Sequence, residues 1–213
     1  MRLSAQNLVY NGSFELYKER PPSVDYALQY FPLHKCLGWD DFCKDTSDYL
    51  GTPTYYYNQP FYESNTWTHP KSPYNGEGFI RLWPYVLKID VFRSQSDRDY
   101  AFGKLINPLE VGKKYKLSLA HTNGQFNPIK IFGHNGFGIL LSTTQPKQKN
   151  QYSRLEIIPQ FRTPYLFQDS TWRIMEFEFV ADSAYRYITM GNFWENYEIE
   201  VMNATDGDFR NYL

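Results

Sequence analysis

The segment Trp172-Arg-Ile-Met-Glu-Phe-Glu-Phe-Val180 carries the clearest structural signal in the sequence. Its apolar side chains at positions 175, 177 and 179 share one face, and Glu176 and Glu178 share the other. A period of two is typical of a β-strand, because successive side chains of a strand point to opposite faces of the sheet. The pattern therefore predicts an antiparallel strand with one face packed on a core and the other in water.

Runs that alternate in the same way, or that are rich in aromatic residues, recur along the chain. Turn dipeptides separate them, and Asn135-Gly136 in particular is expected to form a tight hairpin turn. No segment keeps a period of 3.6, so the sequence predicts an all-β fold, an antiparallel β-sandwich of the jelly-roll type. The expected strands are 7–9, 78–83, 100–106, 115–121, 129–132, 137–143, 154–161, 172–180, 187–193 and 197–202.

Charge and composition exclude several classes of protein. The 22 basic and 23 acidic residues give a formal charge of −1, which removes the counterion release on which nucleic-acid binding depends. No run of 18 apolar residues occurs, so no helix is expected to span a membrane. Aromatic residues make up 19% of the chain, and such rings suit sheet faces and wet binding surfaces.

The 213 residues are expected to form one domain. The jelly roll is predicted to span residues 7–204, with a long aromatic loop region at 16–75 and a polar tail at 205–213. Residues 1–6 are interpreted as the remnant of a signal peptide, because small residues precede the first strand; an ordinary short N-terminus is the alternative.

Cys36 and Cys43 are the only cysteines. Their spacing allows a small disulfide loop in an oxidising compartment, and two free buried thiols are the alternative. A metal site would need two further ligands that the neighbouring sequence does not supply.

The sequence contains no pattern specific to a catalytic centre. Glu176 with Glu178, and Glu198 with Glu200, place two carboxylates on one side of a strand, as a glycosidase would require. A solvated strand face produces the same pattern, and we favour that interpretation. The four histidines show no metal-ligand spacing: His34, His69, His121 and His134.

The loop region offers a surface for sugars. Rings that stack on a pyranose, flanked by carboxylate and amide groups, are the chemistry that such binding needs. The alternative is that these rings bury one another and hold the loop down. The aromatic residues concerned are Tyr55, Tyr56, Tyr57, Phe61, Tyr62, Trp67 and Tyr74.

The chain resembles the galactose-binding-like jelly rolls of secreted carbohydrate-binding modules. Asn7-Leu-Val-Tyr-Asn-Gly-Ser-Phe-Glu15 is similar to their opening strand. A closer likeness is to a domain of secreted and outer-membrane-associated Bacteroidetes proteins, often placed before an outer-membrane protein A-type module. The motifs that carry it, in order, are Gly38-Trp39, Asp48-Tyr49, Gly76-Glu-Gly-Phe-Ile-Arg-Leu82, Arg98-Asp-Tyr100, Gly112-Lys-Lys-Tyr115, Asp169-Ser-Thr-Trp172 and Ile188-Thr-Met-Gly-Asn-Phe193.

The resemblance implies several site residues. Modules of this type often hold a structural calcium ion, for which Glu15 and Glu200 stand near the expected positions. O-glycosylation is expected at Ser170 and Ser183, which follow aspartates in predicted turns. Together with the aromatic loops, the motifs give the candidate ligand-binding residues Trp39, Asp48, Tyr49, Tyr55, Tyr57, Trp67 and Arg81.

These observations together predict a secreted or cell-surface, non-catalytic binding domain whose favoured ligand is a glycan. A protein-interaction subunit of an outer-membrane assembly, with envelope proteins as partners, is the alternative, since an exposed aromatic surface serves both. A jelly-roll hydrolase or lyase comes third.

Overall fold

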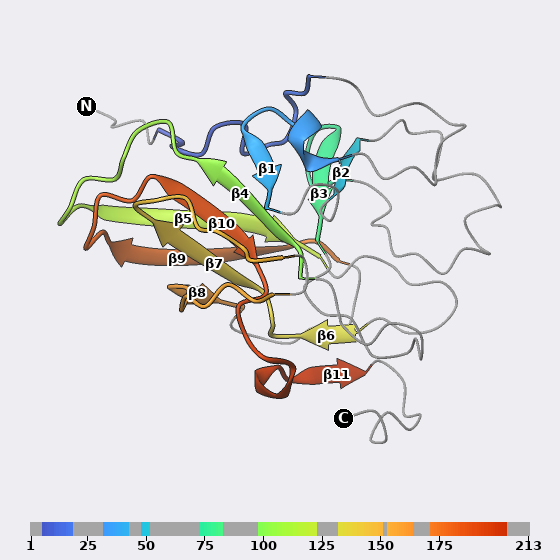
Figure 1. Cartoon of the computed structure of the whole chain (residues 1–213). Helices are drawn as coiled ribbons and strands as arrows, with labels where there is room; N and C mark the ends of the chain where they lie inside the picture. The colour runs from blue at the N-terminus through green and yellow to red at the C-terminus, as the bar shows by residue number, and fades with distance from the viewer. Residues whose placement is uncertain are drawn as a thin grey trace.

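The computed structural model is an all-β protein whose strands pair antiparallel (Figure 1). It describes residues 6–18, 32–42, 48–51, 73–82, 98–122, 132–150, 153–163 and 171–203. Within them the helical elements are single turns of 3₁₀-helix, η1 (Leu33–Lys35) and η4 (Asn196–Glu198). This part of the chain has no helix long and apolar enough to cross a membrane.

In the described part of the chain the strands form one five-stranded sheet and three two-stranded sheets. The larger sheet has the order β1-β4-β10-β7-β8, and the smaller ones pair β5 with β9, β2 with β3 and β6 with β11. Their bounds are β1 Trp39–Asp41, β2 Asp48–Gly51, β3 Gly78–Arg81, β4 Tyr100–Lys104, β5 Lys114–His121, β6 Phe132–His134, β7 Gly138–Ser142, β8 Phe161–Arg162, β9 Arg173–Val180, β10 Tyr187–Gly191 and β11 Val201–Asn203.

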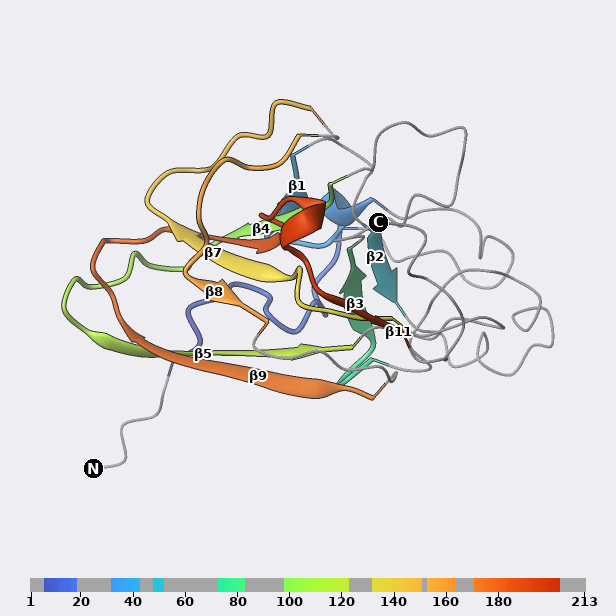
Figure 2. The same ribbon diagram turned by 90° about the horizontal axis from the view of Figure 1, so that it is seen from below.

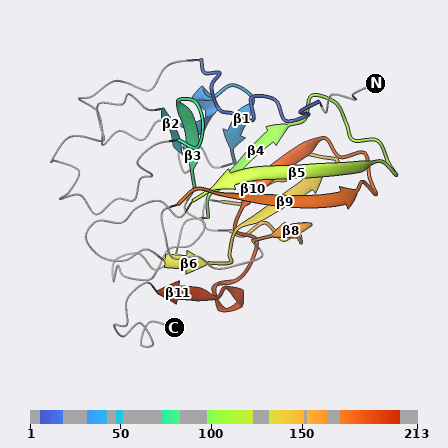
Figure 3. The ribbon, with the colours of Figure 1, turned by 180° about the vertical axis from the view of Figure 1, so that it is seen from behind.

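The β5–β9 pair lies as a second layer against the five-stranded sheet (Figures 2 and 3). Met175 of β9 is 2% exposed, and the Phe177 and Phe179 rings lie 4.8 and 5.2 Å from the Phe161 ring. The opposite face of β9 carries carboxylates that pair with lysines of β5, at 2.6 Å from Glu178 and 2.8 Å from Glu176. The predicted division of this strand into a packed and a wet face is confirmed.

Residues 154–161 are irregular up to β8, although the sequence predicted a strand there. Pro159 lacks a backbone donor for the ladder, and the side chain of Gln160 bonds to the neighbouring strand instead. Its Oε1 accepts from the Leu141 N–H at 2.8 Å, and its Nε2 donates to the Leu141 carbonyl at 3.0 Å. A side-chain amide thus takes the place of one peptide group at this sheet edge.

Other boundaries also differ from the prediction. Asn135-Gly136 forms no hairpin, because β6 pairs with β11 while β7 pairs with β10 and β8. Residues 7–9 contribute a single bridge, Val9 to Leu105, rather than a strand. The predicted strand at 197–202 is divided between η4 and β11, and β1 and β2 were not predicted.

The N-terminal segment is bound to the core through Asn11. Its side-chain Nδ2 donates to the carbonyls of Leu16 and Leu37, each at 2.8 Å, and its Oδ1 accepts from the Leu16 N–H at 2.9 Å. Its carbonyl accepts from the Trp39 indole at 3.0 Å. Asn11 has a φ of 48°, a left-handed conformation that asparagine tolerates better than most residues. One residue therefore joins the opening segment to β1.

Two histidines are the last residues of strands that follow each other in the chain, His121 of β5 and His134 of β6. Both side chains are half-buried. His134 Nδ1 accepts from the Gly136 N–H at 3.1 Å. Burial lowers the pKa of each imidazole to about 4, and the nearby His121 lowers that of His134 further. Both rings are therefore neutral at pH 7.

We expect the thermal stability to fall as the pH drops from about 6.5 toward about 4. The folded-state pKa of each ring lies below its unfolded value. The contribution of the neutral rings to stability is therefore complete above the unfolded pKa, and it is lost as the pH falls from the unfolded toward the folded-state pKa. His134→Asn keeps an acceptor for the Gly136 N–H but does not titrate, so its melting temperature should fall less steeply. Circular-dichroism melts across this pH range measure the difference. Equal pH dependence in the two proteins would contradict the prediction.

Candidate functional site

An exposed tyrosine lies beside a tryptophan where the chain enters β3 and β9. The side chain of Tyr74 is 55% exposed, and its ring centre lies 6.2 Å from that of Trp172 in an edge-to-face arrangement. Trp172 in turn meets the ring of Phe79 edge-on at 6.5 Å, and Phe79 is only 7% exposed. The exposed ring is therefore connected to the core through a second and a third ring.

Two polar residues follow Tyr74 closely in the chain. Asn75 and Glu77 are exposed in the same bend, which leads into β3. The bend is held by Glu15, whose Oε1 accepts from the Glu77 and Gly78 N–H groups, each at 2.9 Å. We refer to Tyr74, Asn75, Glu77 and Trp172 as the Tyr74 surface. It combines a ring that can stack on a flat ligand with an amide and a carboxylate that can bond to hydroxyl groups.

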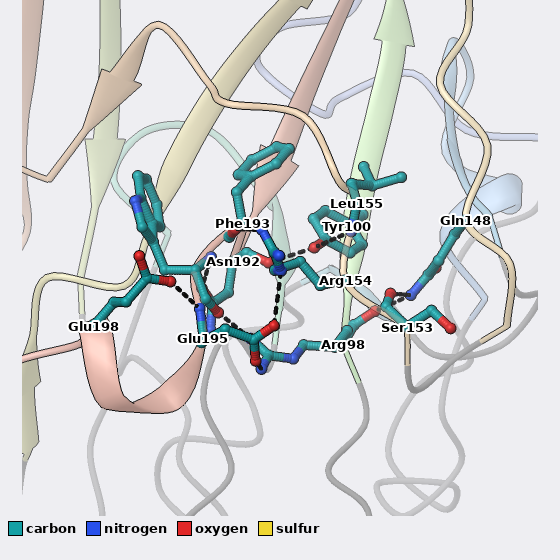
Figure 4. Close-up of polar contacts among 11 residues, drawn as sticks. Arg98, Tyr100, Gln148, Ser153, Arg154, Leu155, Asn192, Phe193, Glu195 and Glu198 are labelled. Atoms are coloured by element: carbon teal, nitrogen blue, oxygen red, sulfur yellow. Dashed lines mark hydrogen bonds and ion pairs between the residues drawn. The ribbon is translucent and has the colours of Figure 1, made fainter.

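A second polar cluster joins the ends of β4 and β10 to the 153–155 segment (Figure 4). The Arg98 side chain is 8% exposed and donates to the Trp194 carbonyl at 2.7 Å. Glu195 accepts from Arg154 Nε at 3.0 Å and lies 3.9 Å from the Arg98 guanidinium. These contacts hold the segment that follows β10 in place, so the cluster has a structural role.

Tyr100 lies at the centre of that cluster and is 1% exposed. Its hydroxyl donates to the Asn192 carbonyl and accepts from the Leu155 N–H at 3.1 Å. Burial raises the pKa of Tyr100 to about 12, so the phenol stays neutral and keeps its donor.

Trp39, one of the predicted ligand-binding residues, is a core residue. Its ring is 4% exposed and lies 5.1 Å from the Phe14 ring, so it offers no face to a ligand. This corrects the interpretation of the Gly-Trp motif, because Trp39 serves to hold the N-terminal segment.

The remaining members of the predicted set lie in or near β2 and β3. Asp48 pairs in register with Arg81, and Tyr49 with Ile80, so the structure brings two of the predicted motifs together. Three members lie outside the described residues: Tyr55, Tyr57 and Trp67.

The two predicted calcium ligands are not brought together. The carboxylate of Glu15 lies at the start of β3, where it accepts from the Gly78 N–H. Glu200 precedes β11, and its N–H donates to Asn135 Oδ1 at 2.9 Å. Figure 1 shows β3 and β11 well apart. The described residues include no group of three or more His, Cys, Asp or Glu side chains that could hold a metal ion.

The predicted disulfide and the predicted O-glycosylation sites each include one described residue. Cys36 is a buried free thiol that accepts from Asn11 Nδ2 at 3.3 Å, and burial raises its pKa to about 12. The structure therefore has Cys36 unpaired rather than in the suggested disulfide, while Cys43 lies outside the described residues. Ser183 lies half-buried in the turn after β9, and Ser170 lies outside the described residues.

The sequence analysis placed Tyr74 in the aromatic loop set but missed Trp172 as a site residue. Trp172 was interpreted as the first residue of a strand, and no local signal distinguishes that role from a contact with Tyr74, about a hundred residues earlier in the chain.

Comparison with known proteins identifies a fold but no family. No family model and no curated protein matches the sequence. Among solved structures, a cyclase from Fischerella sp. TAU in complex with 4-(1H-indol-3-yl)butan-2-one matches with a TM-score of 0.50 and 11% identity, over 96% of this chain and 100% of that chain. At that identity the likeness concerns the fold alone. The matched protein is a cyclase, and this match contradicts the expectation of a non-catalytic domain, which rested on the lack of a catalytic pattern in the sequence.

We expect Tyr100→Phe to lower the free energy of unfolding by about 1–3 kcal/mol, because it leaves the Asn192 carbonyl and the Leu155 N–H without a buried partner. Denaturant unfolding of both proteins measures the change. Tyr185→Phe also removes a hydroxyl, one that bonds to Asp182 in a turn, and should cost less. An equal loss in the two variants would contradict a central role for Tyr100.

Proposed function

We propose that this chain binds carbohydrate, and that the Tyr74 surface is its binding site. The observation that supports this proposal is a tyrosine ring kept 55% exposed although it contacts the half-buried Trp172 ring, which in turn contacts the buried Phe79 ring. Burying such a ring would stabilise the fold by about 1.5–3 kcal/mol, so an exposed position at the edge of the core favours a role in binding.

The chemistry of the surface suits a pyranose ring. The apolar C–H face of the sugar would stack on the Tyr74 ring, which meets the Trp172 ring edge to face. The Asn75 amide can donate and accept, and the Glu77 carboxylate can accept, so both can bond to the hydroxyl groups at the rim of the sugar. A shallow surface of this kind suits a long polysaccharide better than an enclosed small molecule.

We extend the proposal to the finer fold type and to the location. The two facing layers are consistent with a jelly roll of the galactose-binding-like kind, and the resemblance of the Asn7–Glu15 segment favours a secreted or cell-surface protein. The glycan in this proposal belongs to the cell envelope or to material outside the cell.

We expect Tyr74→Ala to weaken polysaccharide binding at least about tenfold, which corresponds to about 1.4 kcal/mol. Its melting temperature should change little, because the ring is mostly in water. Affinity gel electrophoresis with xylan, mannan and β-glucan measures the binding.

Tyr197→Ala is the matched control, because Tyr197 is 86% exposed in η4 and lies outside the Tyr74 surface. It should bind as the unmodified chain does. If none of the polysaccharides retards the unmodified chain, or if both variants lose affinity equally, the proposal is wrong.

A second candidate is an enzyme whose substrate carries an aromatic ring, and the fold match with the cyclase favours it. The same ring pair, with the Glu77 carboxylate beside it, could hold a flat aromatic group. We expect saturable binding of 4-(1H-indol-3-yl)butan-2-one in isothermal titration, lost in Tyr74→Ala. Absence of any heat of binding would count against this candidate.

A further inference from the structure

Glu15 reaches the Tyr74 surface from a distant part of the sequence. Its Oε1 accepts two hydrogen bonds of 2.9 Å from consecutive backbone N–H groups, those of Glu77 and Gly78. Two adjacent N–H groups that converge on one oxygen form a small anion-binding concavity in the backbone. Bonds from such groups to an ionised carboxylate are stronger than those between neutral partners. The bend that carries Tyr74 is therefore closed around the carboxylate of Glu15.

Gly76 makes room for this carboxylate. Its φ of 69° is the left-handed conformation that glycine adopts without strain. A Cβ at this position would lie 2.2 Å from Glu15 Oε1 and 2.6 Å from its Cδ, which is closer than atoms can approach. The bend can thus hold Glu15 only if residue 76 has no side chain.

Glu15 is itself held on both sides. The Phe14 N–H donates to the Asn11 carbonyl at 3.0 Å, and the Leu16 N–H donates to Asn11 Oδ1 at 2.9 Å. The Phe14 ring packs at 5.1 Å against the buried Trp39 ring. The carboxylate therefore extends from a backbone that is bound to the core, and it can impose its position on a bend whose own side chains are exposed.

The donors around Glu15 do not suit a cation. A metal ion bound to Oε1 would compete with two N–H groups whose positive ends point at that oxygen, and the predicted second ligand Glu200 lies at β11. The carboxylate itself accepts the two N–H groups that hold the bend.

We propose that Glu15 is the positioning residue of the Tyr74 surface: its carboxylate, and not a bound cation, sets the bend of residues 74–78 in the conformation that binds ligand. This inference rests on the carbohydrate-binding function proposed above. It identifies a residue that does not touch the ligand but on which the affinity depends.

The test combines amide hydrogen exchange with binding to xylan, mannan and β-glucan. In Glu15→Ala, exchange at the Glu77 and Gly78 amides should accelerate at least about tenfold, because both bonds are lost, and affinity should fall about as far as in Tyr74→Ala. Glu15→Gln keeps an acceptor oxygen and should restore most of both properties. Glu15→Met fills about the same space without an acceptor oxygen, so it should restore neither property, whereas a loss caused by packing alone would be restored by both substitutions.

Gly76→Ala provides an independent test with a matched control. It should reproduce the faster exchange and the weaker binding of Glu15→Ala. Gly112 also has a left-handed φ, 81°, but a Cβ there would meet nothing within 4 Å, so Gly112→Ala carries the backbone strain without the clash. It should leave exchange in the 74–78 bend and affinity unchanged. Thermal melts of every variant confirm that it folds.

The outcomes separate the two proposals. If Tyr74→Ala weakens binding but Glu15→Ala does not, the binding function stands and the role of Glu15 is overturned. If faster exchange leaves the affinity as it was, that role is also overturned. Removal of calcium with a chelator should change neither exchange nor affinity, and a loss restored by added calcium would assign the ordering to a cation instead. If Tyr74→Ala has no effect, both proposals fail.

Discussion

The structure depends on the burial of one face of β9 against the five-stranded sheet. Three apolar side chains of that strand enter the core, led by Met175 at 2% exposure, while the carboxylates opposite them pair with lysines of β5. Since a slip of one residue would exchange the two faces, this contact fixes the register of the layer. It also fixes where β9 begins, and so places Trp172 next to the bend that leads into β3.

The sequence predicted those strands whose alternation reports a packed face. β9, β5, β4 and β10 lie where the pattern placed them. The pattern failed where distant partners decide the pairing. β1 has three residues, too few to show a period. In the segment 154–161, predicted as a strand, the Gln160 side chain takes the place of one peptide group beside Leu141. Asn135-Gly136 has the composition of a hairpin turn, but the neighbouring strands take other partners.

The candidate site was less predictable, because a short sequence motif does not show whether an aromatic side chain is buried or exposed. Trp39 begins β1 and Trp172 directly precedes β9, yet one is a core residue and the other supports an exposed ring. Glu15 was singled out as a calcium ligand because of the family resemblance, and the structure shows that its carboxylate accepts from backbone N–H groups about sixty residues away. Only the folded chain shows that the bend donates two backbone N–H groups to this carboxylate.

The ends of the five-stranded sheet have a consequence for behaviour in concentrated solution. Among the described residues its outermost strands are β1, with three residues, and β8, with two. An open edge this short presents few free peptide groups, and next to β8 the Gln160 side chain already occupies the Leu141 backbone. A second molecule therefore finds little backbone at these two edges of the five-stranded sheet on which to add a strand. A protein with this many aromatic residues gains from such blunt edges, because they oppose the growth of intermolecular sheets.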